Sequence, residues 1–129
     1  MEAAAVSNKI HVLIADDQPL FAETLEALLA TDRRIVVVGS AHDGKEAVRL
    51  WRMHRPDVIL MDISMPVMDG FEATRRIRRE RDDACVLMLT GSNSRTDVDL
   101  ARKAGAAGYV TKDRIAADLI EAIVEVAAR

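Results

Sequence analysis

Cysteine, aromatic residues and long apolar runs are all scarce in this 129-residue chain. The single cysteine, Cys85, cannot form a disulfide within the chain, which favours a reducing, cytoplasmic setting. No apolar run approaches the ~20 residues that a transmembrane helix needs. The first residues do not show a basic region followed by an apolar one, so they do not resemble a secretory signal. We therefore expect a cytoplasmic protein that makes no membrane contact.

An excess of charge of one sign is also missing. The chain has 18 Lys and Arg residues against 21 Asp and Glu residues, and the net charge of −3 gives no reason to expect direct nucleic acid binding by this segment. Its 50% hydrophobic and 30% charged residues are ordinary for a globular protein. The length suits one domain with one core. We expect a disordered tail at residues 1–8 and a single domain at residues 9–129.

Segments with the patterns of strands and helices alternate along the chain. Apolar runs rich in β-branched residues predict five strands, at residues 9–15, 35–40, 58–62, 85–89 and 108–111. Helical spacing of apolar residues predicts five helices, which begin near Pro19, Lys45, Gly70, Thr96 and Ile115. Such regular alternation predicts an α/β fold with a parallel sheet and helices on both faces. We expect the flavodoxin-like, doubly wound arrangement with strand order 2-1-3-4-5.

The stretch from Val58 to Gly70 organises the rest of the chain. Four apolar residues end at the carboxylate of Asp62, as expected of a strand that is covered on both faces. Pro66 cannot donate to a strand ladder and an Asp-Gly pair follows it, so the strand ends soon after Asp62. Taken alone, Asp62 is equally well explained as a turn residue at the end of a strand. The residues at the other strand ends decide between the two interpretations.

Polar residues stand at the carboxyl ends of four of the five predicted strands. They are Asp16 and Asp17 after the first strand, Asp62 on the third, Thr90 on the fourth and Lys112 after the fifth. In a parallel sheet all these ends lie on one edge, and for the order 2-1-3-4-5 the switch point lies between strands one and three. We therefore expect the three carboxylates to meet in that crevice.

The chemistry of this predicted site follows from its charge. Three carboxylates at close range repel one another unless a cation joins them. Hard oxygen ligands suit Mg²⁺ or Mn²⁺, and no set of His and Cys residues favours zinc. A carboxylate beside such an ion can attack phosphorus and form an aspartyl phosphate. The transferring oxygens then need donors, and these are the ammonium group of Lys112, the hydroxyl of Thr90 and the open backbone N–H of Gly91.

Four segments give the chain a resemblance to the receiver domain of two-component response regulators, over essentially residues 9–128. They are Ile14-Ala15-Asp16-Asp17, Met61-Asp62-Ile63-Ser64-Met65-Pro66-Val67-Met68-Asp69-Gly70, Leu89-Thr90-Gly91 and Gly108-Tyr109-Val110-Thr111-Lys112. Together these segments are highly specific, and they identify residues 9–129 as the receiver domain. The stretch from Gly108 to Ile120 is most similar to receivers that precede a helix-turn-helix output domain.

The resemblance implies a role for each acidic residue of the predicted site. It implies that Asp62 accepts a phosphoryl group from the phosphohistidine of a sensor histidine kinase. It implies that Asp17, Asp62 and the backbone carbonyl of Ser64 bind Mg²⁺, with Asp16 assisting through water. A receiver catalyses only its own phosphorylation and dephosphorylation, so we do not expect an enzyme that turns over a separate substrate.

The resemblance also implies roles for residues on the last two strands. Lys112 would bind the phosphoryl group, and Thr90 and Tyr109 would form the pair that switches conformation. Two positions depart from the usual pattern of the family. Asp113 stands where many receivers have proline, which leaves open whether the peptide bond before it is cis. Gly91 stands where alanine is frequent, and we expect it to loosen its loop.

Three functional classes remain open at this point. The first is the front part of a transcription regulator, which switches an output domain that these residues do not contain. The second is a stand-alone receiver that serves a phosphorelay or binds a protein. The third is a Mg²⁺-dependent phosphatase or phosphotransferase that works through an aspartyl phosphate. Such enzymes commonly carry a second acid two residues after the nucleophile, and Ser64 occupies that position here, so the third class is the least favoured.

The sequence also predicts how three of the helices pack or which surface they expose. The helix after Gly70 is crowded with arginines that acidic neighbours balance, so we interpret its surface as a solvated face rather than a partner site. The helix near residues 96–104 has only Val98 and Leu100 as large apolar residues, so we expect it to be weakly held and able to shift. The last helix has more apolar surface than one sheet face needs, so we expect it to contact a partner, most simply a second copy of the chain. Its polar residues form one narrow stripe, Arg114, Asp118, Glu121, Glu125 and Arg129.

Overall fold

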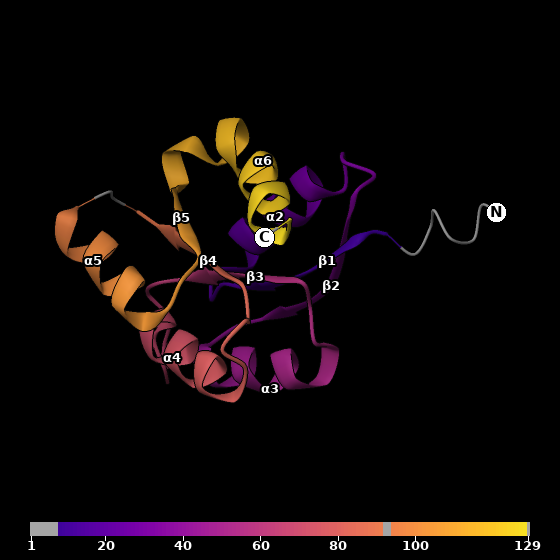
Figure 1. The fold of residues 1–129 in the computed structure, drawn as a ribbon. Coiled ribbons are helices and arrows are strands. Elements are labelled where there is room, and N and C mark those ends of the chain that lie inside the picture. The colour runs from indigo at the N-terminus through magenta and orange to yellow at the C-terminus, as the bar shows by residue number, and fades with distance from the viewer. Residues whose placement is uncertain (1–7, 92–93, 129) are drawn as a thin grey trace.

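The computed structural model describes residues 8–91 and 94–128, so the tail expected at residues 1–8 lies outside the described residues except for Asn8. Within them, five parallel strands form one sheet in the order β2-β1-β3-β4-β5 (Figure 1). The strands are β1 (Ile10–Ala15), β2 (Ile35–Ala41), β3 (Val58–Asp62), β4 (Val86–Thr90) and β5 (Gly108–Thr111). The predicted fold class and strand order are confirmed.

Helices cover both faces of the sheet, with α2 and α6 on one face and α3, α4 and α5 on the other (Figure 1). Their bounds are α2 (Pro19–Leu29), α3 (Gly44–His54), α4 (Gly70–Glu80), α5 (Arg95–Ala104) and α6 (Ile115–Ala127), and a short 3₁₀ turn, η1 (Lys112–Arg114), precedes α6. Each helix begins within one residue of its predicted start. In the described part of the chain, no helix has the length and apolar character that crossing a membrane requires.

Each face of the sheet has its own apolar core. Strands β3 and β4 are buried along their full length, because helices cover both of their faces. Successive residues of a strand point to opposite faces, so Leu60 packs in the core under α2 and α6 while Ile59 packs in the core against α3 and α4. Asp62 ends this run and is only 4% exposed. Because turn residues are rarely so buried, the burial argues that Asp62 has a role beyond the turn.

Helix α5 has little apolar contact with the rest of the molecule. Its only buried residues are Ala101 and Ala104, while Val98 is half-buried and Leu100 is 39% exposed. An alanine side chain removes little apolar area from water, so this packing stabilises the helix weakly. The structure therefore agrees with the weakly held helix that the composition predicts.

The arginine-rich surface of α4 is a set of exposed ion pairs. Arg75 and Arg76 both donate to Glu72, at 2.8 and 3.0 Å, and Arg52 of α3 donates to Glu80 at 2.7 Å. Such exposed pairs contribute little to stability. They offset only part of the positive charge of α4, because Arg75 and Arg76 share Glu72 and Glu80 pairs with an arginine of α3. The interpretation of this surface as a solvated face stays a prediction.

Helix α6 buries more of its apolar surface than its composition predicts. The buried side chains are Ile115, Leu119, Ile123 and Val126. Ile120 and Val124 are half-buried, and none of the large apolar side chains that the structure describes on α6 is fully exposed. The apolar surplus is therefore limited to these two residues and to small alanines beside them.

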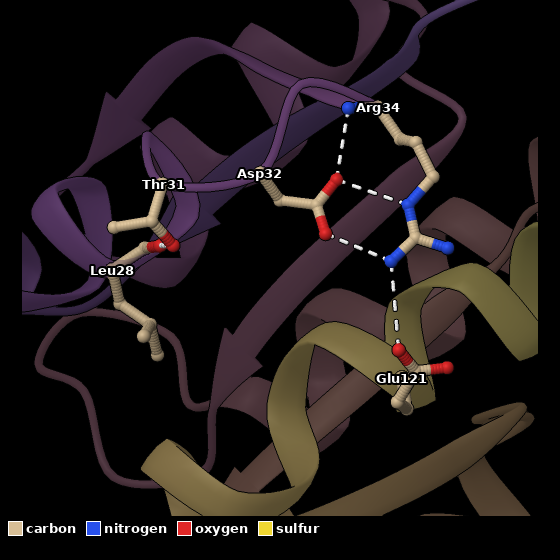
Figure 2. A network of polar contacts seen from close by, with 5 residues as sticks. All are labelled: Leu28, Thr31, Asp32, Arg34 and Glu121. Carbon is tan, nitrogen blue, oxygen red and sulfur yellow. Dashed lines mark hydrogen bonds and ion pairs between the residues drawn. The ribbon is translucent and has the colours of Figure 1, made fainter.

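A polar network links α6 to the loop after α2, and Figure 2 shows its five residues. Arg34 donates to both carboxylate oxygens of Asp32, at 3.0 and 2.8 Å, and its guanidinium lies 3.5 Å from Glu121 of α6. The hydroxyl of Thr31 donates to the carbonyl of Leu28 at 2.7 Å. Hydrogen bonds from Arg34 lower the pKa of Asp32 to about 2. Because the ion pairs are exposed, they orient the loop against α6 more than they stabilise the fold.

Candidate functional site

The carboxyl ends of β1 and β3 bring three carboxylates together. Asp16 and Asp17 follow β1, and Asp62 is the last residue of β3, which pairs with β1. One carboxylate oxygen from each of the three lies within 4.8 Å of the others. Asp16 and Asp62 are buried, whereas Asp17 is not. The crevice that was predicted at the switch point of the sheet therefore contains the expected acidic residues.

Two glycines at helix starts fix the loop that follows Asp62. A side chain at Gly70 would overlap the backbone carbonyl of Asp62, and a side chain at Gly44 would overlap that of Met68. The amide of Gly70 also donates to the carbonyl of Ile63 at 2.9 Å. Only glycine allows α3 and α4 to begin so close to the loop. The backbone of the acidic site is thus held by direct contact with two helices.

Lys112 is the cation of the site. Its Nζ lies 3.2 Å from Oδ1 of Asp62 and 3.8 Å from Oδ2 of Asp16. Burial raises the pKa of Asp16, and burial together with the charge of Asp16 raises the pKa of Asp62. One ammonium group therefore faces more than one unit of negative charge, and the two buried carboxylates ionise less readily than exposed ones.

The oxygen atoms of this cluster fit a hard divalent cation. Oδ1 of Asp16 accepts from the amide of Gln18 at 2.8 Å, but its buried Oδ2 has no hydrogen-bond partner among the described residues. Carboxylate oxygens without nitrogen or sulfur ligands suit Mg²⁺ or Mn²⁺. Ser64, whose carbonyl was predicted as a further ligand, is an exposed residue of the adjoining loop. The donor set at this edge is therefore chemically suited to the predicted ion.

The remaining predicted site residues lie along the last two strands. Thr90 is buried at the end of β4, and Gly91 after it is exposed, with no atom within 4 Å of the position that a side chain would take. Tyr109 lies on the edge strand β5 and is 43% exposed, beside a hollow of about 200 Å³ between β5 and α5. The described residues contain no cis peptide bond, so the bond between Lys112 and Asp113 is trans.

One residue at the site, Phe21, is not among those predicted from the sequence. The Nζ of Lys112 lies 4.7 Å from the centre of the Phe21 ring. Phe21 belongs to the first turns of α2, shortly after the acidic pair that ends β1. An aromatic residue so soon after the acidic pair is the signal in the sequence that points to this contact.

The family of response regulator receiver domains matches residues 12–124 of the chain. The chain belongs to this family. It is similar to the transcriptional regulatory protein DegU of Brevibacillus brevis, with 42% identity over 120 residues that make up 93% of this chain and 51% of DegU. The receiver chain thus spans about half the length of the curated relatives it matches. The resemblance inferred from the sequence is confirmed.

Solved structures agree with this membership. The signal receiver domain of NarL from Mycobacterium tuberculosis superimposes with a TM-score of 0.89 at 34% identity, covering 94% of this chain and 98% of that one. A complex of CheX and CheY with BeF₃ and Mg²⁺ from Borrelia burgdorferi gives a TM-score of 0.84 at 26% identity, covering 91% of this chain and 88% of that one. The receiver fold is therefore shared over nearly the whole chain.

Replacing Asp16 with asparagine is expected to stabilise the metal-free receiver against urea near pH ~7. Burial raises the pKa of Asp16 above its ordinary value of 3.8, so the folded chain binds more protons than the unfolded chain above that value. Stability is therefore lost as the pH rises through this window. Asparagine removes the buried charge, and its amide oxygen can still accept from Gln18.

Urea midpoints in the presence of a chelator measure this effect, and the gain should shrink below pH ~4, where the carboxyl is protonated in both states. Asp57→Asn is the matched control, because Asp57 also accepts a backbone amide, from His11 at 2.7 Å, but is exposed. A lower midpoint for Asp16→Asn than for the control near neutral pH would contradict the prediction.

Proposed function

We propose that Asp62 accepts a phosphoryl group in a Mg²⁺-dependent reaction and that a sensor histidine kinase supplies it. One observation carries the proposal: Asp62 is buried beside two further carboxylates and a cation. Carboxylate oxygens of Asp16 and Asp17 lie within 4.8 Å of one of its own, and the ammonium group of Lys112 lies 3.2 Å from its Oδ1. A nucleophile for phosphorus needs this combination of a metal site and a positive donor.

In the proposed reaction, an oxygen of Asp62 attacks phosphorus, and the bond from phosphorus to the donor's imidazole nitrogen breaks. The electron pair of that bond stays on the nitrogen, which then takes up a proton, and the product is an aspartyl phosphate. The ammonium of Lys112, the hydroxyl of Thr90 and the amide of Gly91 stabilise the negative charge of the transferring oxygens. Lys112 needs little movement, because it already contacts Asp62.

The residues proposed to hold Mg²⁺, or Mn²⁺ in its place, are Asp16, Asp17, Asp62 and Ser64 through its backbone carbonyl. The buried Oδ2 of Asp16, which has no hydrogen-bond partner among the described residues, supports this assignment. When bound, the ion neutralises charge on the phosphoryl oxygens. Burial is the larger cause of the raised pKa of Asp62, and repulsion from Asp16 is the second. The ion would relieve that repulsion.

Turnover of small phosphate esters is the less favoured chemistry for this site. A phosphatase of that kind needs an acid to protonate the leaving group, commonly two residues beyond the nucleophile. Ser64 holds that position and is exposed, and a serine hydroxyl is a poor acid near neutral pH. We therefore propose a receiver that acts on its own aspartate rather than an enzyme with a separate substrate.

Asp62→Asn is expected to abolish phosphorylation by acetyl phosphate and Mg²⁺, because an amide cannot act as the nucleophile. Intact-mass measurement should show one added phosphoryl group on the native chain and none on the variant. Asp82→Asn, which changes an exposed aspartate outside the site, is the control and should label normally. Normal labelling of Asp62→Asn would overturn the proposal, and steady release of phosphate far beyond one equivalent would instead favour a phosphatase.

We propose further that phosphorylation switches the chain through Thr90 and Tyr109. Thr90 lies at the end of β4 beside the acceptor strand, so its hydroxyl can move toward a phosphoryl group on Asp62. Tyr109 is exposed beside the hollow between β5 and α5, which offers space into which its ring can turn. Because α5 is weakly packed, it is the element that such a movement biases most easily.

The single tyrosine of the chain makes this switch measurable. With 3-fluorotyrosine at Tyr109, addition of beryllofluoride and Mg²⁺ should shift the ¹⁹F resonance and reduce its solvent exposure. Thr90→Ala should suppress the shift. Fluorotryptophan at Trp51, the only tryptophan and a buried residue of α3, serves as the control and should change little. An unchanged Tyr109 resonance in the native chain would rule out the proposed switch.

The output that we propose is transcription regulation in the cytoplasm. DegU is named as a transcriptional regulatory protein, and this chain matches about half of the length of DegU. We propose that a DNA-binding domain outside these residues reads the state of the receiver. The net charge of −3 gives the receiver itself no evident role in contacting nucleic acid.

A second copy of the chain is the proposed partner of α6. Exposed alanines continue along one side of the helix from the half-buried Ile120 and Val124, which leaves a small apolar strip. Val124→Glu is expected to weaken a dimer in sedimentation velocity, and beryllofluoride is expected to strengthen the dimer of the native chain. Met53→Glu, which charges an exposed apolar residue of α3, is the control. A monomer under all these conditions would end the proposal.

A further inference from the structure

Among the described residues, the ammonium group of Lys112 lies close to two carboxylates and one aromatic ring. Asp62 and Asp16 lie at 3.2 and 3.8 Å, and the face of the Phe21 ring lies with its centre 4.7 Å from Nζ. An aromatic ring attracts a cation over its face at distances up to about 6 Å. The lysine side chain is 27% exposed, so most of it is covered by the protein.

The two charged contacts are the ones that the proposed reaction changes. Asp62 loses its negative charge on the oxygen that becomes bonded to phosphorus. Asp16 is a proposed ligand of the metal site, and a bound cation competes with Lys112 for its carboxylate. The ring of Phe21 is neutral and takes part in neither event, so its attraction for the ammonium group is the same before and after transfer.

The ring is itself held in a defined place. Phe21 is half-buried and packs against the core that α2 and α6 form with the sheet. Leu25 and Leu29, on the same face of α2, are fully buried and anchor that helix. Lysine, in contrast, has a flexible four-carbon stem that costs conformational entropy to hold in one place. A rigid ring beside a flexible cation reduces the range of positions that the cation occupies.

We propose that Phe21 is a positioning residue for Lys112, holding its ammonium group over the acceptor site by cation–π attraction. The proposal rests on the proposed function, because it assigns Phe21 to the step in which Lys112 contacts the phosphoryl group. It also links two elements of the site: the helix that follows the acidic pair carries the ring, and the turn after β5 carries the lysine.

A positioning role and a merely structural role of Phe21 predict different effects on Mg²⁺ affinity. A ring that only packs α2 would, when removed, disturb the acidic pair just before the helix and weaken Mg²⁺ and phosphoryl binding together. A ring that positions Lys112 would, when removed, weaken phosphoryl binding alone. Affinity for Mg²⁺ would stay equal or rise, because a freed lysine competes less for the carboxylates.

Phe21→Leu keeps an apolar side chain and removes the aromatic face. We expect about three- to tenfold slower phosphorylation by acetyl phosphate and a similar loss of beryllofluoride affinity, as expected for one cation–π contact. Phe21→Trp should retain or exceed the native rate. Phe71→Leu is the matched control: Phe71 is the only other phenylalanine, is also half-buried near the start of its helix, and has no cation over its ring in the described part of the chain.

A fluorinated series tests the electrostatic origin directly. Adding one, two and three fluorine atoms to the ring of Phe21 weakens the negative face stepwise with little change in shape, so the phosphorylation rate should fall stepwise too. A phosphorylation rate that stayed constant along the series would overturn the cation–π assignment. Loss of Mg²⁺ affinity in Phe21→Leu equal to the loss of beryllofluoride affinity would show a structural role instead and would also overturn it.

NMR of Lys112 separates this inference from the proposed function. The chain has four lysines, Lys9, Lys45, Lys103 and Lys112, so their side-chain signals can be assigned. The ring current of Phe21 should displace the ε-methylene resonances of Lys112, and Phe21→Leu should remove the displacement without any phosphoryl donor present. If the native chain failed to phosphorylate, the proposed function would fall while this contact could still be seen. Normal phosphorylation with no displaced resonance would refute the role of Phe21 alone.

Discussion

The imbalance between several carboxylates and one ammonium group is the constraint on which the rest of this receiver depends. Burial raises the pKa of both Asp16 and Asp62, and Lys112 is the only cation within ion-pair distance of them in the described residues. Such a site opposes folding when it is ionised. It persists because β3, which carries Asp62, is buried along its whole length, and β1 is buried over its last four residues. A bound cation would offset the excess negative charge.

The sheet turns this imbalance into a defined geometry. β1 and β3 pair in parallel and end at the same edge, so Asp16 and Asp62 meet without any long loop to carry them. Gly70 then presses the start of α4 against the backbone of Asp62, and Gly44 does the same for α3 and the following loop. The backbone of Asp62 is therefore fixed by main-chain contacts, which tolerate changes of charge at the side chains better than a network of polar side chains would.

The sequence predicted the edge of the sheet well because parallel topology converts order along the chain into neighbours in space. The chain order of the strand ends was enough to bring Asp16, Asp62 and Lys112 together. It was not enough for Phe21, whose contact with Lys112 joins two segments far apart in the sequence through the direction of two side chains. The burial of α6 was underestimated for a related reason, because periodicity reveals an apolar face but not how much of it a neighbouring helix covers.

The site also lies where a fully buried strand is followed by a weakly packed helix. β4 is buried throughout and ends at Thr90, whereas α5, the next element along the chain, buries only two alanines. A ligand can shift a conformational equilibrium only by the difference in its affinity for the two states. Because α5 buries so little apolar area, little free energy is lost when it shifts, which is why we propose it as the element that a new contact to Thr90 would bias. Helix α4, in contrast, begins in close contact with the backbone of Asp62 at Gly70 and buries Ile77 fully, so its packing is tighter than that of α5.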